Sequence, residues 1–260
     1  MKKQIAALIF AVLPAFAFAS GGEELHLDKV DIDLTDKAAL QDGARTFANY
    51  CMGCHSAQFQ RYERVAKDLD IPEKLMMENL VLTGAKIGDH MSIGMKPQDA
   101  KVWFGAAPPD LTLVARVRGS DWLYSYLRSF YEDPTRPWGV NNKVFPNVGM
   151  PNVLAGLQGR QVVGCKQVQV VEDGKKVFDP LTGTPVTKEG CHELTVVPKS
   201  GKLSEAEFDD KVKNLVTFLT YSANPVKLES QRIGTYVLLF LVFFFVFAYL
   251  LKREYWKDVH

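Results

Sequence analysis

The uncharged stretch near the C-terminus restricts the fold of this chain more than any other feature. Residues Ile233 to Leu251 contain no charged side chain over 19 positions, and at about 1.5 Å per residue they would reach roughly 28 Å, close to the thickness of a bilayer core. This length matches one membrane-spanning α-helix. Phenylalanines occur all round that helix, which is unusual for a buried helix of a soluble protein. The sequence therefore predicts one transmembrane helix over residues 232–251.

The residues that follow this stretch indicate its orientation. Lys252 and Arg253 come first, and Tyr255 and Trp256 are aromatic residues of the kind found at membrane interfaces. By the positive-inside rule, the tail over residues 252–260 is predicted to lie in the cytoplasm. The domain that precedes the helix is then predicted to lie on the other side of the membrane.

The N-terminus has the pattern of a secretory signal. Lys2 and Lys3 precede an apolar run from Ile5 to Phe18, and Ala17-Phe18-Ala19 provides the small residues that a signal peptidase requires. A second membrane anchor is the alternative, but the run is short for a span. We predict a signal peptide over residues 1–19 and an exported domain over residues 20–231.

The exported domain is close to neutral. Between Gly21 and Gln231 there are 28 Asp or Glu against 25 Lys or Arg, so nucleic-acid binding is not expected. Acidic residues gather near the start of this domain, where a solvated surface is favoured over a docking patch for a basic partner. They are Glu23, Glu24, Asp28, Asp31, Asp33 and Asp36.

Apolar periodicity predicts a mainly α domain with a small β excursion. Helices are expected from Asp36 to Tyr50 with Thr35 as N-cap, from a capping box at Ser204 to Asn224, and from Asp121 to Tyr131. Residues 135–159 are rich in Pro, Gly and Asn and should be irregular. Residues 160–197 are rich in valine and contain Asp173-Gly174, a turn signal, so a β-hairpin is expected there.

The sequence Cys51-Met52-Gly53-Cys54-His55 matches C-x-x-C-H, the attachment signature of c-type haem. Two thiols three residues apart can each form a thioether to one vinyl group, and the next residue then places an imidazole on the axial side of the iron. This predicts a cytochrome c-like domain with one covalently attached haem c and His55 as a ligand of the iron.

Two other site types share part of this motif. A thioredoxin-like dithiol does not require the histidine and normally opens a βα unit, whereas here the pair follows a predicted helix. A zinc site would need a second pair of ligands nearby. Both alternatives are disfavoured, and a thiol oxidoreductase would contain no haem.

A cytochrome that only transfers electrons needs a sixth iron ligand, and methionine raises the reduction potential relative to a second histidine. Met150 is favoured because it lies in the rigid, irregular segment Gly149-Met150-Pro151. Met76 and Met77 are interpreted as packing residues of a helix. Met91 and Met95, expected in a loop, stay open as alternatives.

Two arginines and two cysteines complete the set of candidate residues. Arg116 and Arg118 could neutralise haem propionates, although chemistry alone leaves a surface role equally open. Cys165 and Cys191 remain once the haem has taken its pair, and in an oxidising compartment they are expected to form a disulfide across the β excursion. Two free thiols are the alternative.

Together these parts resemble the cytochrome c1 family. The resemblance runs from about Asp36 to the C-terminus and includes the haem motif, Arg116-x-Arg118, Gly149-Met150-Pro151 and a segment typical of the proteobacterial form. That segment is Trp103-Phe104-Gly105-Ala106-Ala107-Pro108-Pro109-Asp110-Leu111.

The resemblance implies the haem subunit of the cytochrome bc1 complex, or ubiquinol–cytochrome c reductase, in the respiratory chain of a bacterial inner membrane. It implies cytochrome b and the Rieske iron–sulfur protein as partners, an electron received from the Rieske protein, and a soluble cytochrome c as acceptor. The subunit would be an electron relay within an enzyme, with its haem domain in the periplasm. It implies that Met150 is the distal ligand, that Arg118 binds a propionate and that Pro109 lines the haem. A stand-alone anchored cytochrome that serves an oxidase or another reductase is the alternative.

Overall fold

The computed structural model describes residues 27–172 and 175–257. The predicted signal peptide, the Asp173-Gly174 turn and the last three residues of the predicted tail lie outside the described residues.

A helical domain forms the core, and its centre is the packing of two helices from opposite ends of the sequence of this domain. α2 (Lys37–Tyr50) lies against α9 (Glu205–Ala223). The ring centroids of Phe47 and Phe218 are 5.5 Å apart. Gly43 permits this approach, because a Cβ there would lie 2.1 Å from the backbone oxygen of Asn214. The fold is mainly helical, as the sequence predicted.

Short elements surround this pair. They are β1 (Ala57–Arg61), α3 (Tyr62–Asp68), α4 (Glu73–Asn79), β2 (His90–Met91), α5 (Pro97–Phe104), α6 (Val114–Arg118), α7 (Ser120–Arg128), β3 (Phe130–Glu132), β4 (Val140–Asn142) and α8 (Ala155–Gln158). β1 pairs antiparallel with β2, and β3 with β4. α6 and α7 both contact α9, so the two helices are packed against the helical core.

Two expected helix boundaries are wrong. The N-cap of α2 is Asp36, whose carboxylate accepts from the N–H of Ala39 at 3.0 Å. Thr35 is not the cap because its backbone N–H and hydroxyl both donate to Asp33. The helix expected to reach Tyr131 ends at Arg128, since Phe130 and Tyr131 pair with β4 instead.

The other expectations about elements are confirmed in outline. Ser204 and Glu207 form the predicted capping box at the start of α9. The segment 135–159 is mostly irregular but contains β4 and α8.

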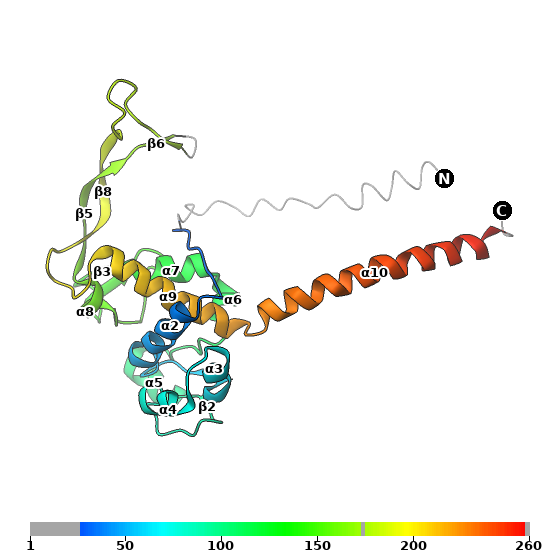
Figure 1. Ribbon diagram of the computed structural model, residues 1–260. Coiled ribbons are helices and arrows are strands. Elements are labelled where there is room, and N and C mark those ends of the chain that lie inside the picture. The colour runs from blue at the N-terminus through cyan, green and yellow to red at the C-terminus, as the bar shows by residue number, and fades with distance from the viewer. Residues whose placement is uncertain (1–26, 173–174, 258–260) are drawn as a thin grey trace.

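The β excursion is a two-stranded arm that Figure 1 shows extending away from the helical domain. β5 (Gln161–Gln169) pairs with β8 (Thr187–Val196), and β6 (Val171–Glu172) with β7 (Lys175–Lys176). The backbone of Cys165 lies opposite that of Cys191, and Cys165 is disulfide-bonded.

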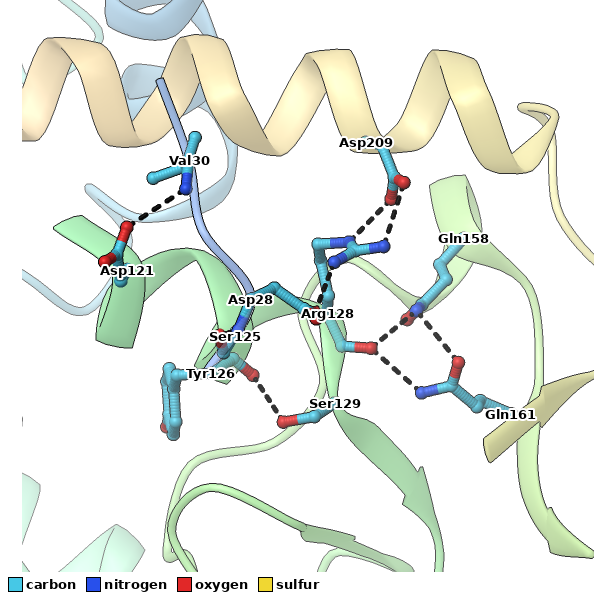
Figure 2. A network of polar contacts seen from close by, with 10 residues as sticks. All are labelled: Asp28, Val30, Asp121, Ser125, Tyr126, Arg128, Ser129, Gln158, Gln161 and Asp209. Atoms are coloured by element: carbon cyan, nitrogen blue, oxygen red, sulfur yellow. Dashed lines mark hydrogen bonds and ion pairs between the residues drawn. The ribbon is translucent and has the colours of Figure 1, made fainter. Parts of the chain in front are cut away.

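A network around Arg128 joins the base of this arm to the helical core (Figure 2). The Arg128 guanidinium donates to both carboxylate oxygens of Asp209 in α9, at 2.6 and 2.8 Å, and to Asp28 at 2.6 Å. Its carbonyl accepts from the amides of Gln158 and Gln161, at 3.0 and 2.9 Å. One residue thereby ties the N-terminal segment, α7, α9 and the first strand of the arm together.

The last helix, α10 (Lys227–Tyr255), projects from the end of α9 as a single rod (Figure 1). It has a mean hydropathy of 2.5 over its most apolar window, and none of that window is buried. Its length and composition make it a candidate for a membrane span and match the predicted transmembrane segment.

Candidate haem site

The C-x-x-C-H motif forms a tight turn at the end of α2. Cys51 is the C-cap residue, and its N–H donates to the carbonyl of Phe47 at 2.9 Å. The N–H groups of Cys54 and His55 both donate to the carbonyl of Cys51, at 3.0 and 2.9 Å. Neither Cys51 nor Cys54 pairs with another cysteine. The helix predicted from the sequence therefore delivers two thiols and an imidazole on one turn.

The imidazole of His55 is held by a residue far along the chain. Its Nδ1 lies 2.7 Å from the carbonyl oxygen of Pro109, and because a carbonyl only accepts, Nδ1 carries the proton. Burial lowers the pKa of His55, although the Pro109 carbonyl and the Asp110 carboxylate act in the opposite direction. The neutral ring therefore presents the Nε2 lone pair, which is the form that binds a metal.

The Cys51 thiol is buried in a way that disfavours a charged sulfur. Burial, with the nearby Cys54, raises the pKa of Cys51 to about 12. A zinc ligand or a reactive dithiol needs a thiolate, whereas a thioether is uncharged and has no such cost. In the described part of the chain, no group of three or more His, Cys, Asp or Glu could hold a metal ion. The site suits thioether attachment.

The segment after Pro109 runs alongside the residues that follow the motif. The N–H of Leu111 donates to the carbonyl of Ser56 at 2.8 Å, and the N–H of Gln58 donates to the Asp110 carboxylate at 2.8 Å. These bonds fix the position of the Pro109 carbonyl relative to His55.

Met150 belongs to an aromatic cluster built on α7. The hydroxyl of Tyr126 donates to the Met150 sulfur at 3.3 Å, and the Tyr126 ring stacks on Trp122 at 4.9 Å. The Arg118 guanidinium lies over the rings of Trp122, at 4.9 Å, and Phe145, at 5.9 Å. The structure thus brings together Met150 and Arg118, which the sequence singled out separately.

The sequence reasoning missed Tyr126 as a residue of the site. Burial raises the pKa of its hydroxyl, which stays protonated and able to donate. The only signal in the sequence was the i, i+4 spacing of Trp122 and Tyr126, which places them on one helix face. From the sequence alone, this spacing indicates only a helix.

The remaining methionines are less suited to bind iron. Met76 is completely buried and Met77 packs against the same core, as predicted. Met91 was expected in a loop, but it lies in β2 and is only 2% exposed, because β2 pairs with β1 over the core. Met95 lies in an irregular segment and is partly buried.

The residues present fit a haem. Arg116 and Arg118 are exposed, and among the described residues neither guanidinium pairs with a carboxylate. Val117 between them is 77% exposed, and Leu113 and Phe145 are 45% and 44% exposed. A flat apolar ring with two anionic propionates would cover such apolar side chains and pair with such cations.

A neutral buried imidazole beside two cysteines on one turn defines the class of this protein as a c-type cytochrome. The chain belongs to the cytochrome c1 family, because residues 29–160 and 201–259 match the model of that family. The β arm falls between the two matched ranges.

Individual relatives agree with this assignment. The chain is 50% identical over 260 residues to cytochrome c1 of Allochromatium vinosum, which covers 100% of both proteins. It is 40% identical over 259 residues to the ammonia monooxygenase gamma subunit of Nitrosomonas europaea, with 99% of this chain and 100% of that protein covered. A solved chain of a hyperthermophilic respiratory Complex III aligns with 99% of this chain and 94% of its own at 16% identity and a TM-score of 0.44.

Membership of this family gives the general role of the chain. Cytochrome c1 proteins carry one covalently bound c-type haem and are membrane-anchored electron-transfer subunits of the cytochrome bc1 complex. The apolar helix α10 is the candidate anchor of this chain.

Proposed function

We propose that the haem is attached through thioethers to Cys51 and Cys54, with His55 as proximal and Met150 as distal ligand of the iron. The observation that carries this proposal is the hydrogen bond from His55 Nδ1 to the Pro109 carbonyl at 2.7 Å. It fixes the ring orientation and leaves Nε2 as the free lone pair, the usual arrangement of a histidine that ligates a metal.

Around these ligands, Arg118 and Arg116 would neutralise the propionates, and Pro109 would line the haem. The exposure of Val117 and Phe145 beside the Arg118 guanidinium supports this placement. Cys165 would pair with Cys191, since it is disulfide-bonded and the two backbones are in register.

In the assembly, the chain would receive an electron from the Rieske iron–sulfur protein and pass it to a soluble cytochrome c, beside cytochrome b. The signal peptide over residues 1–19 would direct residues 20–231 to the periplasm, and the tail from Lys252 would lie in the cytoplasm. The basic residues after the apolar span support this orientation.

When bound, the haem supplies one-electron chemistry through its iron. The protein's own residues do the rest. His55 is held by Pro109, so its ring need not reorient when the charge of the site changes. Tyr126 fixes the Met150 sulfur by a hydrogen bond. The exposed apolar side chains near Arg118 would be covered by the bound haem, and the water excluded there would favour a small reorganisation on electron transfer.

Purification of the tagged chain in mild detergent tests the assembly. Cytochrome b and the Rieske protein should co-purify, and the preparation should reduce soluble cytochrome c with quinol. On a denaturing gel the haem should stay with the chain, and Cys51→Ser with Cys54→Ser should abolish that signal. A fully active single subunit without partners would instead support the stand-alone cytochrome.

The Nitrosomonas relative raises a second candidate, a subunit of ammonia monooxygenase, on the basis of its name and 40% identity. The same purification distinguishes the two, since monooxygenase subunits would then replace cytochrome b and the Rieske protein.

A further inference from the structure

A hollow of about 340 Å³ opens where the helical domain meets α10. Its walls come from the start of α2, from α3, from the end of α9 and from the first turn of α10. A volume of this size is typical of sites for small ligands. None of the residues proposed to hold the haem lines it.

The charge of the hollow favours an anion. Four cationic side chains and two carboxylates line it, and the cations are Lys37, Arg64, Lys67 and Lys227. The Asp68 carboxylate is already engaged, because it accepts from Arg64 and from the Tyr221 hydroxyl at 2.8 Å. Lys37 bonds the Asp68 carbonyl and lies 3.5 Å from Asp70.

Two lysines and one carboxylate are left in the wall, because Glu229 in the first turn of α10 also forms no ion pair among the described residues, and the remaining charge is positive. Within the described residues, neither Lys67 nor Lys227 forms an ion pair, and both are exposed. Lys227 begins α10, where Val226 gives no side-chain cap to the helix. The N–H groups of this first turn add a partial positive charge beside the two ammonium groups.

The depth of the hollow identifies the source of the anion. Leu228 in its wall lies five residues before Ile233, the start of the uncharged span, which is about 7.5 Å along a helix. Headgroup layers add roughly 5 to 8 Å on each side of the hydrocarbon core. The hollow therefore lies level with phospholipid headgroups, and α10 continues from it into the span (Figure 1).

Its walls also suit a lipid. Leu34, Pro225 and Leu228 provide apolar surface beside the cations, and the helix below is exposed along its whole length. We propose that this hollow binds the phosphate headgroup of an anionic phospholipid from the leaflet that faces the haem domain, with its acyl chains along α10.

Lipid selectivity of the full-length haem protein tests this proposal. The protein is placed in phosphatidylcholine nanodiscs that contain spin-labelled phosphatidylglycerol or spin-labelled phosphatidylcholine, and electron spin resonance gives the immobilised fraction of each. The unchanged protein should prefer phosphatidylglycerol. The double variant Lys67→Gln with Lys227→Gln should lower this preference about fivefold or more, since each lysine near a membrane surface attracts anionic lipid.

The matched control is Lys252→Gln with Lys257→Gln, which removes the same charge from the far end of α10. It should keep most of the preference. An equal loss in both variants would mean general attraction of charge, and an unchanged preference in the Lys67 and Lys227 variant would overturn the proposal. Inorganic phosphate should displace the label no better than chloride at equal ionic strength; stronger displacement by phosphate would overturn the lipid as ligand. The haem spectrum of each variant confirms its fold.

Discussion

At the scale of single residues, His55 depends on a partner 54 positions away for its chemistry. The motif provides the imidazole, but the Pro109 carbonyl selects which nitrogen carries the proton. Met150 is held in a similar way by Tyr126, whose hydroxyl donates to the sulfur. Pro109 and Tyr126 contact the proposed ligands and not the iron itself, and through these ligands they are expected to change the reduction potential of the iron.

Substitution of the distal residues tests this arrangement. Met150→Leu should change the ferric spectrum and lower the midpoint potential, because a thioether ligand favours ferrous iron. Tyr126→Phe should keep the ligand but lower the potential by tens of millivolts, since the hydrogen bond weakens electron donation by sulfur. A redox titration followed by absorbance gives the ferric spectrum and the midpoint potential of each variant. If Met150→Leu changed neither property, Met95 would become the next residue to test, and Met91 after it.

Asp42 makes stability depend on pH at the contact between α2 and α9. Burial alone would raise its pKa, but hydrogen bonds from Lys211, Asn214 and Arg45 outweigh burial and lower it. A lowered pKa stabilises the fold above the unfolded-state value of about 3.9, and this contribution is lost as pH falls through the folded-state pKa.

Asp42→Asn should therefore lower the free energy of unfolding by about 1 to 3 kcal/mol at neutral pH. The difference from the unchanged protein should shrink below about pH 4, where Asp42 becomes protonated first in the unfolded state and then, at lower pH, in the folded state. Urea unfolding at several pH values measures this. Asp31→Asn, on an exposed residue, serves as control, and a difference independent of pH would contradict the assignment.

At the scale of elements, the distance between α2 and α9 sets the position of the haem motif, because Cys51 caps α2. The two helices approach so closely at Gly43 that an added Cβ would meet the Asn214 backbone at 2.1 Å and the Phe218 Cβ at 2.7 Å. Backbone on the opposite side cannot move aside as a flexible side chain would.

Gly43→Ala should therefore destabilise the domain by about 1 to 3 kcal/mol, the usual cost of overpacking, even though alanine favours helices. Thermal unfolding followed by haem absorbance measures the loss. Gly94→Ala is the control, since a Cβ there meets nothing within 4 Å. Equal stability of the two variants would show that the helices can separate without cost.

Arg128 connects four parts of the chain and is only 21% exposed in its side chain. Arg128→Met should cost about 2 to 4 kcal/mol, because it leaves the half-buried Asp209 carboxylate without its partner. Arg160→Met removes an equally well-aligned pair with Glu132, at 2.6 and 2.9 Å, but Arg160 is 65% exposed. Its loss should cost much less than that of Arg128, because exposed ion pairs contribute little to stability. Denaturant unfolding compares them, and equal costs would rule out a special role for the network.

At the scale of the whole molecule, the haem domain and the membrane helix are separable. No residue of α10 is buried, so the helical domain is expected to be stable without this helix. A chain that ends after Gln231 should therefore leave the membrane fraction with its haem spectrum unchanged. Sedimentation and absorbance of the fractions test this, and a truncated chain that lost its haem would contradict it.

Several features were accessible from the sequence because they depend on local rules. The haem motif needs a fixed spacing, the apolar span needs only length and composition, and the box at Ser204 and Glu207 closes within one turn. The β arm followed from valine-rich strands that flank a turn. Such patterns determined the class of protein, its anchor and most of its helices.

Other features were decided by tertiary structure, because they depend on partners distant in sequence. The N-cap of α2 is a local exception, since Thr35 donates to Asp33 two residues earlier and Asp36 becomes the cap. Phe130 is not part of α7 because its backbone pairs with that of Asn142 in β4. The Pro109 carbonyl at His55, the Tyr126 hydroxyl at Met150 and the hollow beside α10 arise only when separate segments fold together. Local sequence patterns therefore predict a haem and a membrane helix, whereas packing between distant segments sets the orientation of the His55 ring and the Met150 sulfur.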